Sequence, residues 1–486
     1  MIEWGISANS HDAALAVVKN NGIVFASHAE RFSGVKNDAH LNQTLVYYAL
    51  KFGKPDKVYW YEKPVLKTLR QVRAGQGLRL QENNIKQYLS QFGISAPDVY
   101  REHHRSHAAG SYYTSQFRSA AIVCIDAIGE WQTLSIWQGK RRDLTELFSQ
   151  SYPHSVGLWY SAMTQRVGLK PNEDEYILMG MAAYGDPDRL REDIKHSFFK
   201  SFPTVDNLSV KFKHNLHRGC LWWREDLSNK QDLFDIAAAT QAVYEELFDS
   251  LLHSVKSFMP QEQNLVLTGG CALNCAANQI AYRYFDQVWI MPNPGDAGNA
   301  LGAILDDFTE WPGPYLGYEI PGKYPVRELL AELENTGIAG VANGKAEYGP
   351  RALGNRSLLA DPRGSNIKDR VNEIKHRQKF RPFAPAILEE HAEEYFEGPV
   401  GPYMQFTARC RYPHKYPAIV HKDGTSRVQT VGKNDNPGFR QLLEEWYART
   451  GCPMLLNTSL NIKGKPMVNT EQDARAFENT YGVKVW

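Results

Sequence analysis

The sequence predicts an α/β protein with an N-terminal domain of two similar lobes and a smaller C-terminal domain. The first lobe opens as a β-meander, because three short apolar runs follow one another and Asn21-Gly22 forms a strong hairpin turn between the second and third. A helix-like stretch between Leu41 and Leu50 comes next. The three strands are expected at residues 2–8, 13–19 and 23–27.

The same plan starts again near Ala121. The run AIVCIDAIGE reads as a strand and WQTLSIWQGK as its hairpin partner, and residues 232–258 form a long amphipathic helix. Two further strands run into glycine-rich turns and helices at residues 264–270 and 287–305. A meander followed by helices is typical of the ribonuclease-H-like half of an actin-type ATPase, so the duplication favours that fold.

Length and composition fit this plan. The chain has 486 residues, enough for two or three domains, and its 43% hydrophobic and 22% charged residues are ordinary for a globular protein. No apolar run is long enough to span a membrane and no secretory leader is visible, and six cysteines without paired spacing fit a cytoplasmic protein. Pro- and Gly-rich residues 311–324 mark the boundary, so we expect domains at 1–320 and 325–486.

Two histidines and two aspartates form a candidate metal site. In the stretch EHHRSHA, His103 and His107 are four residues apart and share one face of a helix. Asp126 ends a buried-type strand and Asp296 follows another, which is where open α/β folds bind ligands. Two imidazoles with carboxylates suit iron, zinc or manganese, and the alternative is a pair of surface or core histidines without an ion.

Glycine turns suggest a nucleotide site. The segments TGGCALN (268–274), PGDAGNALGA (294–303) and MGMAAYG (179–185) each place small residues at a strand end or helix start. Such turns let a phosphate approach the backbone N–H groups closely. One turn alone is a weak signal, but three at the strand ends of two similar lobes make an ATP cleft plausible.

Net charge is +1, yet basic residues exceed acidic ones in the last third of the chain. Ten Lys and Arg lie between Lys345 and Arg381, and several are embedded among small and apolar residues in GPRALGNRSLLADPR. An arginine in such a setting more often holds a carboxylate or phosphate than covers a solvated face. We therefore expect Arg351 and Arg356 to bind an anionic cofactor. His11, in the turn between the first two strands, is a candidate general base.

In this order, these segments resemble the NodU/CmcH family of O-carbamoyltransferases over nearly the whole chain. Eleven collinear stretches carry the resemblance, among them SHDAALAVV, HHRSHAAGSYY, LTGGCALNCAAN, YGPRALGNRSLLADPR, IKHRQKFRPFAPAIL and LLNTSLNIKGKPMV. It implies an actin-like N-terminal domain similar to the tRNA threonylcarbamoyl-transferase and a YrdC-like α/β C-terminal domain. It also implies that carbamoyl phosphate and ATP, with Mg²⁺, give carbamoyladenylate, whose carbamoyl group then passes to an acceptor hydroxyl.

The resemblance also implies roles for individual residues. A Lys-x-Arg motif and a Ser-x-Asn motif form the adenylate. His11 acts in the transfer step, and Asp12 orients His11 or binds the acceptor. In the N-terminal domain, one set of residues binds a metal, expected to be iron, and a second set contacts the nucleotide. The motif residues are Lys375, Arg377, Ser459 and Asn461; the metal ligands are His103, His107, Asp126 and Asp296; the nucleotide contacts are Gly269, Gly270 and Asn274.

No motif in the sequence identifies the acceptor, although two basic stretches suggest a large anionic molecule. Five basic residues and no acid lie between Lys63 and Arg79, and residues 195–224 mix basic residues with Trp222-Trp223. Such stretches can follow a phosphate backbone and stack a base. The hydroxymethyl group of a modified pyrimidine such as 5-hydroxymethylcytosine in DNA is therefore one acceptor hypothesis. A sugar or antibiotic hydroxyl is another, and two solvated basic faces are the plainer interpretation.

Other functions remain open at this point. An actin-fold small-molecule kinase would make ADP and would leave the Lys375 and Ser459 motifs without a purpose. A non-catalytic ATP-dependent module would leave His11 and the histidine–aspartate set unexplained. Threonylcarbamoylation of tRNA would use bicarbonate and threonine, and the fused domain order argues for NodU/CmcH instead. The sequence does not distinguish a monomer from a homodimer.

Overall fold

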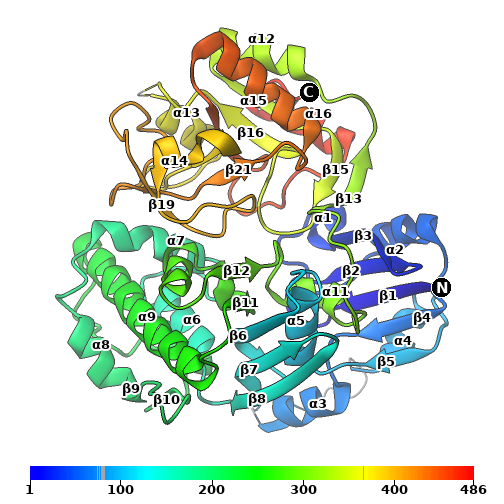
Figure 1. Ribbon diagram of the computed structural model, residues 1–486, viewed down its shortest axis with the longest axis vertical. Coiled ribbons are helices and arrows are strands. Elements are labelled where there is room, and N and C mark those ends of the chain that lie inside the picture. Colours follow the sequence, from blue (N-terminus) through cyan, green and yellow to red (C-terminus); the bar gives the residue numbers. More distant parts are fainter. Residues whose placement is uncertain (74, 76, 78–82, 365) are drawn as a thin grey trace. The chain divides into compact units, whose positions relative to one another are not determined.

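The chain divides into two units in the computed structural model, which describes residues 1–73, 75, 77, 83–364 and 366–486. The first unit comprises Met1–Ala29 and Asp38–Trp311, and the second comprises Glu30–Asn37 and Pro312–Trp486 (Figure 1). Within the described part of the chain, no helix is both long and apolar enough to cross a membrane.

The first sheet of the first unit has five strands in the order β3-β2-β1-β4-β5. The first three are antiparallel neighbours, and β4 and β5 continue the sheet in parallel with β1. The hairpin turn between β2 and β3 forms where Asn21-Gly22 predicts it, with Asn20 and Asn21 both at positive φ. The strands are β1 (Ile2–Ser7), β2 (Ala14–Lys19), β3 (Gly22–His28), β4 (Lys57–Trp60) and β5 (Asp98–Tyr100).

The second sheet repeats this topology in the order β8-β7-β6-β11-β12 when it is read from its meander edge. Its first three strands are antiparallel, and β11 and β12 run parallel to β6. Two sheets of the same order confirm the duplicated actin-like fold. The strands are β6 (Ser119–Gly129), β7 (Gln132–Lys140), β8 (Asp143–Ser151), β11 (Asn264–Thr268) and β12 (Gln287–Ile290).

Helices complete the first unit. The longest, α9, confirms the predicted helix near 232–258 and begins at a capping box in which Asn229 and Asp232 satisfy each other's backbone N–H groups. The helices are α2 (Gln43–Ala49), α3 (Pro64–Arg73), α4 (Ile85–Ser90), α5 (His103–Tyr112), α6 (Val156–Arg166), α7 (Glu175–Met181), α8 (Arg191–Phe198), α9 (Lys230–Phe258), α10 (Cys275–Asn278) and α11 (Asn299–Gly302), and β9 (Phe199–Ser201) pairs with β10 (Lys211–Phe212).

Two of these helices, α5 and α11, cross between the two sheets (Figure 1). Helix α11 packs on β1 and β2, whereas α5 packs on β6 and β11. Their crossing is close because glycines face each other: a Cβ on Gly110 would lie 3.0 Å from the Cα of Gly302, and a Cβ on Gly302 would lie 1.9 Å from the carbonyl oxygen of Ser106. This crossing brings the start of α5 near the loop that precedes α11.

The second unit contains a mixed five-stranded sheet in the order β14-β16-β22-β17-β21, with two smaller sheets. Helices α12 and α15 cover part of the large sheet. This α/β architecture agrees with the expected class. The strands are β13 (Tyr315–Ile320), β14 (Ile338–Ala342), β15 (Gly344–Glu347), β16 (Arg356–Ala360), β17 (Ala384–Leu388), β18 (Phe396–Glu397), β19 (Ala408–Cys410), β20 (Thr425–Ser426), β21 (Gln429–Val431) and β22 (Met454–Ser459); the helices are α1 (Glu30–Ser33), α12 (Val326–Thr336), α13 (Ile367–Ile374), α14 (Ala392–Tyr395), α15 (Pro437–Thr450) and α16 (Glu471–Tyr481).

The boundary between the units differs in one respect from the expected division into 1–320 and 325–486. The chain enters the second unit at Pro312, within the Pro- and Gly-rich stretch, but residues 30–37 also pack with that unit. Arg31 donates to the carbonyl of Gly349 over 2.9 Å, and the ring of Phe32 lies against Tyr318. Long-range contacts of this kind leave no local signal in the sequence.

The glycine crossing gives a first prediction. Gly302→Ala should destabilise the protein by about 1–3 kcal/mol, because the new methyl group must push α11 away from α5. It should also lower the amount of bound divalent metal. Chemical denaturation and elemental analysis measure the two effects. Gly295→Ala is the matched control, since a Cβ there has nothing within 4 Å. Equal stability and metal content in both variants would contradict this account of the crossing.

Candidate functional site

The structure brings the four predicted metal ligands of the first unit together. His103 and His107 begin α5, Asp126 lies in β6, and Asp296 starts a short 3₁₀ turn, Asp296–Gly298. One donor atom from each lies within 4.8 Å of the donors of the others. The Nε2 atom of His103 is 3.1 Å from Nε2 of His107 and 3.3 Å from a carboxylate oxygen of each aspartate.

The charges of this cluster depend on one another. Burial disfavours the imidazolium, but the two aspartates outweigh it and raise the pKa of His103 well above its ordinary value. Burial likewise opposes ionisation of Asp296, yet His103 and His107 hold its pKa well below the usual range. Two carboxylates and two imidazoles converging in a buried site therefore attract a positive charge strongly. This donor set fits a divalent transition metal such as iron, zinc or manganese.

Neighbouring side chains hold the ligands in place. The backbone N–H of Gly270 donates to Asp126 over 3.1 Å, and Asn299, the first residue of α11, lies 3.5 Å from Nε2 of His103. Sequence reasoning missed Asn299, although its position three residues after Asp296 in one glycine-rich loop is a signal. Such contacts orient metal ligands and fix their protonation.

His104 stays apart from the metal ligands. Its Nδ1 lies 2.7 Å from the Ser135 hydroxyl, which also accepts a hydrogen bond from the indole N–H of Trp137. Burial, with the charge of His103, lowers the pKa of His104 to about 3. His104 is therefore a neutral core histidine, while His103 and His107 face the two aspartates.

The glycine turn after β11 is fixed by hydrogen bonds. Gly269 has a left-handed φ of 85° and donates to the carbonyl of Pro294, and the Gly270 N–H is taken by Asp126. Asn274 caps α10 and pairs through its amide with Gln241. The turn therefore holds the metal site together, and a nucleotide contact by these three residues stays a prediction.

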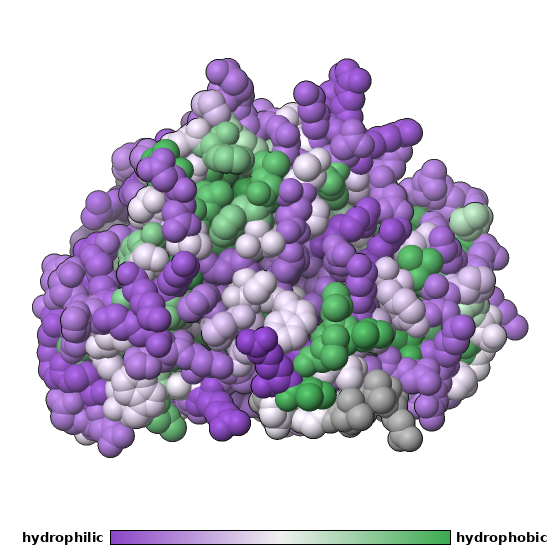
Figure 2. Space-filling view, turned by 90° about the horizontal axis from the view of Figure 1, so that it is seen from below, coloured by the Kyte–Doolittle hydropathy of each residue, from purple (hydrophilic) through white to green (hydrophobic). Residues whose placement is uncertain are grey.

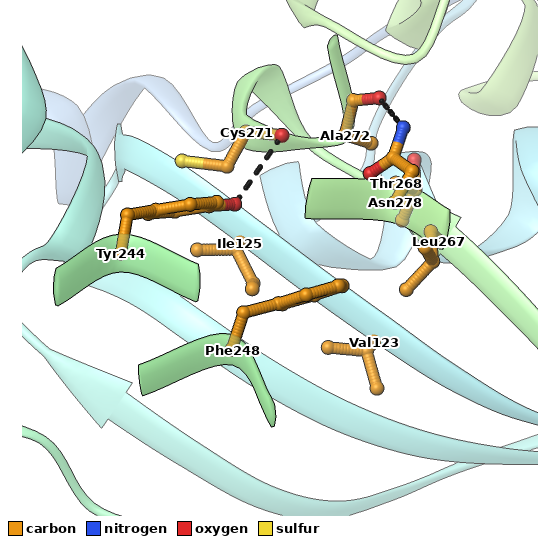
Figure 3. A pocket seen from close by; sticks show the side chains of 9 residues that line it. All are labelled: Val123, Ile125, Tyr244, Phe248, Leu267, Thr268, Cys271, Ala272 and Asn278. Atoms are coloured by element: carbon orange, nitrogen blue, oxygen red, sulfur yellow. Dashed lines mark hydrogen bonds between the residues drawn. The ribbon is translucent and has the colours of Figure 1, made fainter. Parts of the chain in front are cut away.

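A small cavity lies behind this turn, between α9, β6 and β11 (Figure 3). Its volume is about 10 Å³, far below the roughly 300 Å³ of a small ligand pocket, and its walls are mainly apolar. The hydroxyl of Tyr244 donates to the Cys271 carbonyl over 3.4 Å, and Asn278 donates to the Ala272 carbonyl over 2.8 Å. The cavity is a packing space beneath the turn, not a nucleotide pocket.

His11 and Asp12 follow β1 in the first unit. The Nε2 atom of His11 is buried and has no hydrogen-bond partner among the described residues. Asp12 takes a left-handed φ of 56° and contacts His28 through both carboxylate oxygens. His11 also lies near enough to Glu175 to lower the pKa of that carboxyl, although burial dominates and raises it overall. The turn is therefore polar, half-buried and adjacent to a second carboxyl group.

In the second unit, the structure brings together three of the four adenylate-forming candidates. The Lys375 ammonium, buried at the end of α13, lies 3.2 Å from the hydroxyl of Ser459 and 2.9 Å from the amide oxygen of Asn461, and it also contacts both backbone carbonyls. Ser459 donates to the Asn461 amide oxygen over 2.6 Å. Burial first, then Arg377 and Arg381, hold the pKa of Lys375 well below its ordinary value.

Arg377 places a second positive charge near Lys375. Arg377, whose guanidinium lies 3.9 Å from the centre of the Phe383 ring, is fixed by the side chain of Asn372 and the carbonyl of Pro382. It is held beside Lys375 instead of moving into solvent. An anion such as a phosphate would relieve the repulsion between the two groups.

Arg356, expected to bind an anionic cofactor, has a structural role instead. Its side chain is wholly buried at the start of β16, and its guanidinium donates to backbone carbonyls on several segments. This speaks against a cofactor contact, because the donors are already used inside the fold. The half-buried neighbour Arg351, on the preceding loop, keeps the expected role as a proposal. The carbonyls belong to Tyr318, Asn343, Gly344, Asn355 and Asn469.

Two of the three residues that form the basic helix face predicted between Lys63 and Arg79 point inward, whereas the third, Arg73, is exposed. On α3, Lys67 and Arg70 are buried, and Lys67 pairs with Glu62. The outward face is apolar: Val65, Leu69 and Val72 are 70%, 56% and 49% exposed, and Figure 2 shows apolar side chains beside the residues drawn in grey. Arg79 lies outside the described residues. The sequence pattern was correct about shared faces and wrong about which face meets solvent.

The second basic stretch, 195–224, is neutralised only in part, because Lys200, Lys211, Lys213 and Arg218 are exposed. Lys195 pairs with Glu192 and Glu246, and Arg224 pairs with Asp193 and Asp226. Trp223 is buried, so only Trp222 of the tryptophan pair is open to stacking. Burial and pairing therefore remove part of the basic surface that a nucleic-acid acceptor would need.

Comparison with known families decides the assignment. The carbamoyltransferase N-terminus matches residues 58–305, and the carbamoyltransferase C-terminus matches residues 330–485. This chain belongs to the carbamoyltransferase family. It is an enzyme of the transferase class, and its first unit carries the N-terminal part of the family and its second unit the C-terminal part.

Named relatives agree with this family. An uncharacterized protein of Synechocystis sp. is 33% identical, over 98% of this chain and 94% of its own length. Nodulation protein NolO of Bradyrhizobium diazoefficiens is 34% identical, over 76% and 75%. The 3'-hydroxymethylcephem-O-carbamoyltransferase of Amycolatopsis lactamdurans is 28% identical, over 97% and 95%. Full-length HypF in a phosphate- and nucleotide-bound form is 11% identical, with a TM-score of 0.37 over 63% of this chain and 55% of that chain.

The position of Arg356 gives a second prediction. Arg356→Ala should lower the free energy of unfolding by about 3 kcal/mol or more, because several buried carbonyls lose their donors. Arg351→Ala, five residues earlier, should change it by less than about 1 kcal/mol. Urea denaturation measures both variants. If Arg356→Ala were as stable as Arg351→Ala, the structural role assigned to Arg356 would be wrong.

Proposed function

We propose that this protein is an ATP-dependent O-carbamoyltransferase that activates a carbamoyl group as carbamoyladenylate and passes it to an acceptor hydroxyl. The observation that carries the proposal is the buried cluster of Lys375, Ser459 and Asn461 beside Arg377. A kinase of the actin fold has no need for such a pocket in an added domain. The family assignment supplies the carbamoyl chemistry, and the pocket supplies a place to bind its phosphate.

The activation step belongs to the second unit. Water splits carbamoyl phosphate into carbamate and phosphate, and a carbamate oxygen then attacks the α-phosphorus of ATP, so that pyrophosphate leaves. Lys375 and Arg377 neutralise phosphate charge in this account, while Ser459 and Asn461 hold the Lys375 ammonium at the reacting groups. Arg351, half-buried on the loop before β16, is a further phosphate contact. Mg²⁺ accompanies ATP.

The transfer step belongs to the first unit. The acceptor oxygen attacks the carbamoyl carbon, AMP leaves, and His11 accepts the hydroxyl proton at Nε2. Asp12 binds the acceptor or orients the imidazole of His11. A metal bound by His103, His107, Asp126 and Asp296 would supply positive charge for the phosphate of the adenylate. Iron is the expected metal, and Gly269, Gly270 and Asn274 are the expected nucleotide contacts.

The acceptor is proposed to be a small hydroxylated molecule. The name of the cephem relative gives a hydroxymethyl group as its acceptor. In the two basic stretches considered for DNA, Lys67 and Arg70 are buried, and Lys195 and Arg224 are paired with acids. A sugar or antibiotic hydroxyl therefore fits better than 5-hydroxymethylcytosine in DNA.

The two steps can be separated by mutation. Lys375→Met should lower pyrophosphate release at least 100-fold, since the phosphate loses its buried cation, whereas His11→Asn should spare pyrophosphate release and stop product formation. Mass spectrometry of adenylate and of carbamoylated acceptor, from a panel of sugars, aminoglycosides and cephems, measures both.

Lys379→Met is the control for the first variant, because Lys379 is exposed four residues away and should leave both steps unchanged. Pyrophosphate release at the normal rate by Lys375→Met, or full product yield from His11→Asn, would overturn the corresponding assignment.

The pocket of Lys375 gives a pH prediction. The ammonium attracts phosphate and the neutral amine does not, so kcat/KM for carbamoyl phosphate should fall as pH rises through the pKa of Lys375. Because burial and two arginines lower this pKa, the fall should begin well below 10.5. Lys375→Arg should flatten the profile, since a guanidinium stays charged. A flat pH profile in the wild-type protein would contradict a role for the charge of Lys375 in binding phosphate.

A further inference from the structure

His28 joins two parts of the candidate transfer centre. It is the last residue of β3 and is buried, with 3% of its surface exposed. Its Nδ1 lies 3.0 Å from each carboxylate oxygen of Asp12, and its Nε2 lies 2.9 Å from the amide nitrogen of Asn293. All three residues belong to the first unit.

The two partners of His28 fix its tautomer. An amide nitrogen can only donate, so Nε2 of His28 accepts from Asn293 and carries no proton. The ring proton must then sit on Nδ1, where it is donated to the Asp12 carboxylate. His28 thus aims a single N–H donor at both oxygens of Asp12.

This arrangement connects functional loops that are far apart in the sequence. Asp12 follows His11 in the turn between β1 and β2, at a left-handed φ that the short Asp side chain tolerates. Asn293 starts the loop that carries Asp296, and its carbonyl oxygen packs against Gly298 so closely that a Cβ there would lie 1.9 Å away. His28 therefore ties the turn of the proposed general base to the loop of the metal ligand.

We propose that His28 is a positioning residue for carbamoyl transfer: it holds the Asp12 carboxylate in one orientation, so that its exposed edge meets the acceptor hydroxyl. This inference deepens the proposed function and rests on it. The side chain of Asp12 keeps 21% of its surface exposed, whereas that of His28 keeps 4%. Asp12 is thus the member of the pair that an acceptor can touch, and His28 acts only through it.

Three substitutions separate the two hydrogen bonds. His28→Asn keeps a donor near the place of Nδ1, so Asp12 stays held. His28→Gln keeps an acceptor near the place of Nε2, so only Asn293 stays bound. His28→Leu removes both. Transfer should remain within a few-fold of wild type in His28→Asn and fall about 10- to 100-fold in the other two, as for residues that orient a functional group. KM for the acceptor should rise in those two variants.

Pyrophosphate release is the internal control, because His28 is outside the second unit. It should be unchanged in all three variants. Transfer by His28→Asn as poor as by His28→Leu would overturn the proposal, since the donor to Asp12 would then be irrelevant. So would equal losses of pyrophosphate release and transfer, which would show a general folding defect.

A spectroscopic readout tests the geometry without any turnover. Nitrogen-15 spectra of imidazole-labelled protein should show a protonated Nδ1 and an unprotonated Nε2 for His28 at neutral pH, assigned by the loss of the signals in His28→Asn. The opposite tautomer or an imidazolium would overturn the proposal. If the wild-type protein forms no carbamoylated product, the proposed function fails while the tautomer assignment still stands.

Discussion

The first unit depends on the buried convergence of two imidazoles and two carboxylates. His103 and Asp296 would each be unfavourable alone in this interior, since burial opposes the charged form of both. Together they stabilise each other, and a bound cation would do so more strongly. The glycine crossing of α5 and α11, the Gly270 N–H and Asn299 all keep the four groups within reach of one ion. The duplicated sheet provides the frame on which these contacts are possible.

The candidate site of the second unit is built from positively charged side chains instead. Lys375 is surrounded by oxygens of Ser459 and Asn461 and is repelled by Arg377 and Arg381. A site that holds several cations in a fixed, partly desolvated arrangement is prepared for an anion before the anion arrives, which is how electrostatic catalysis avoids reorganisation. The two clusters thus differ in charge, and the proposed activation and transfer of a carbamoyl group would use both.

Much of this could be predicted from the sequence, because the signals were local. The hairpin at Asn21-Gly22, the strand–turn–helix segments and the spacing of His103 and His107 each follow from backbone geometry over a few residues. The meeting of Asp126 with Asp296 followed from the rule that ligands bind at strand ends.

The remaining features depended on long-range packing. On α3, periodicity grouped Lys67 and Arg70 correctly but could not show that this polar face lies inside against Glu62. Arg356 looked like an anion ligand because its neighbours in the sequence are small, but its guanidinium binds backbone carbonyls inside the fold, such as those of Asn343 and Asn355. Residues 30–37 join the second unit through contacts more than 280 residues away in the chain, as Arg31 with Gly349 shows.

The most direct test of the account is the product of activation without an acceptor. The protein, ATP, Mg²⁺ and carbamoyl phosphate labelled with carbon-13 in the carbonyl group would be mixed, and nucleotides would be analysed by mass spectrometry. The account predicts labelled carbamoyladenylate and pyrophosphate in equal amounts, formed only when both substrates are present. ADP in place of pyrophosphate, with no labelled adenylate, would contradict it and would indicate a kinase.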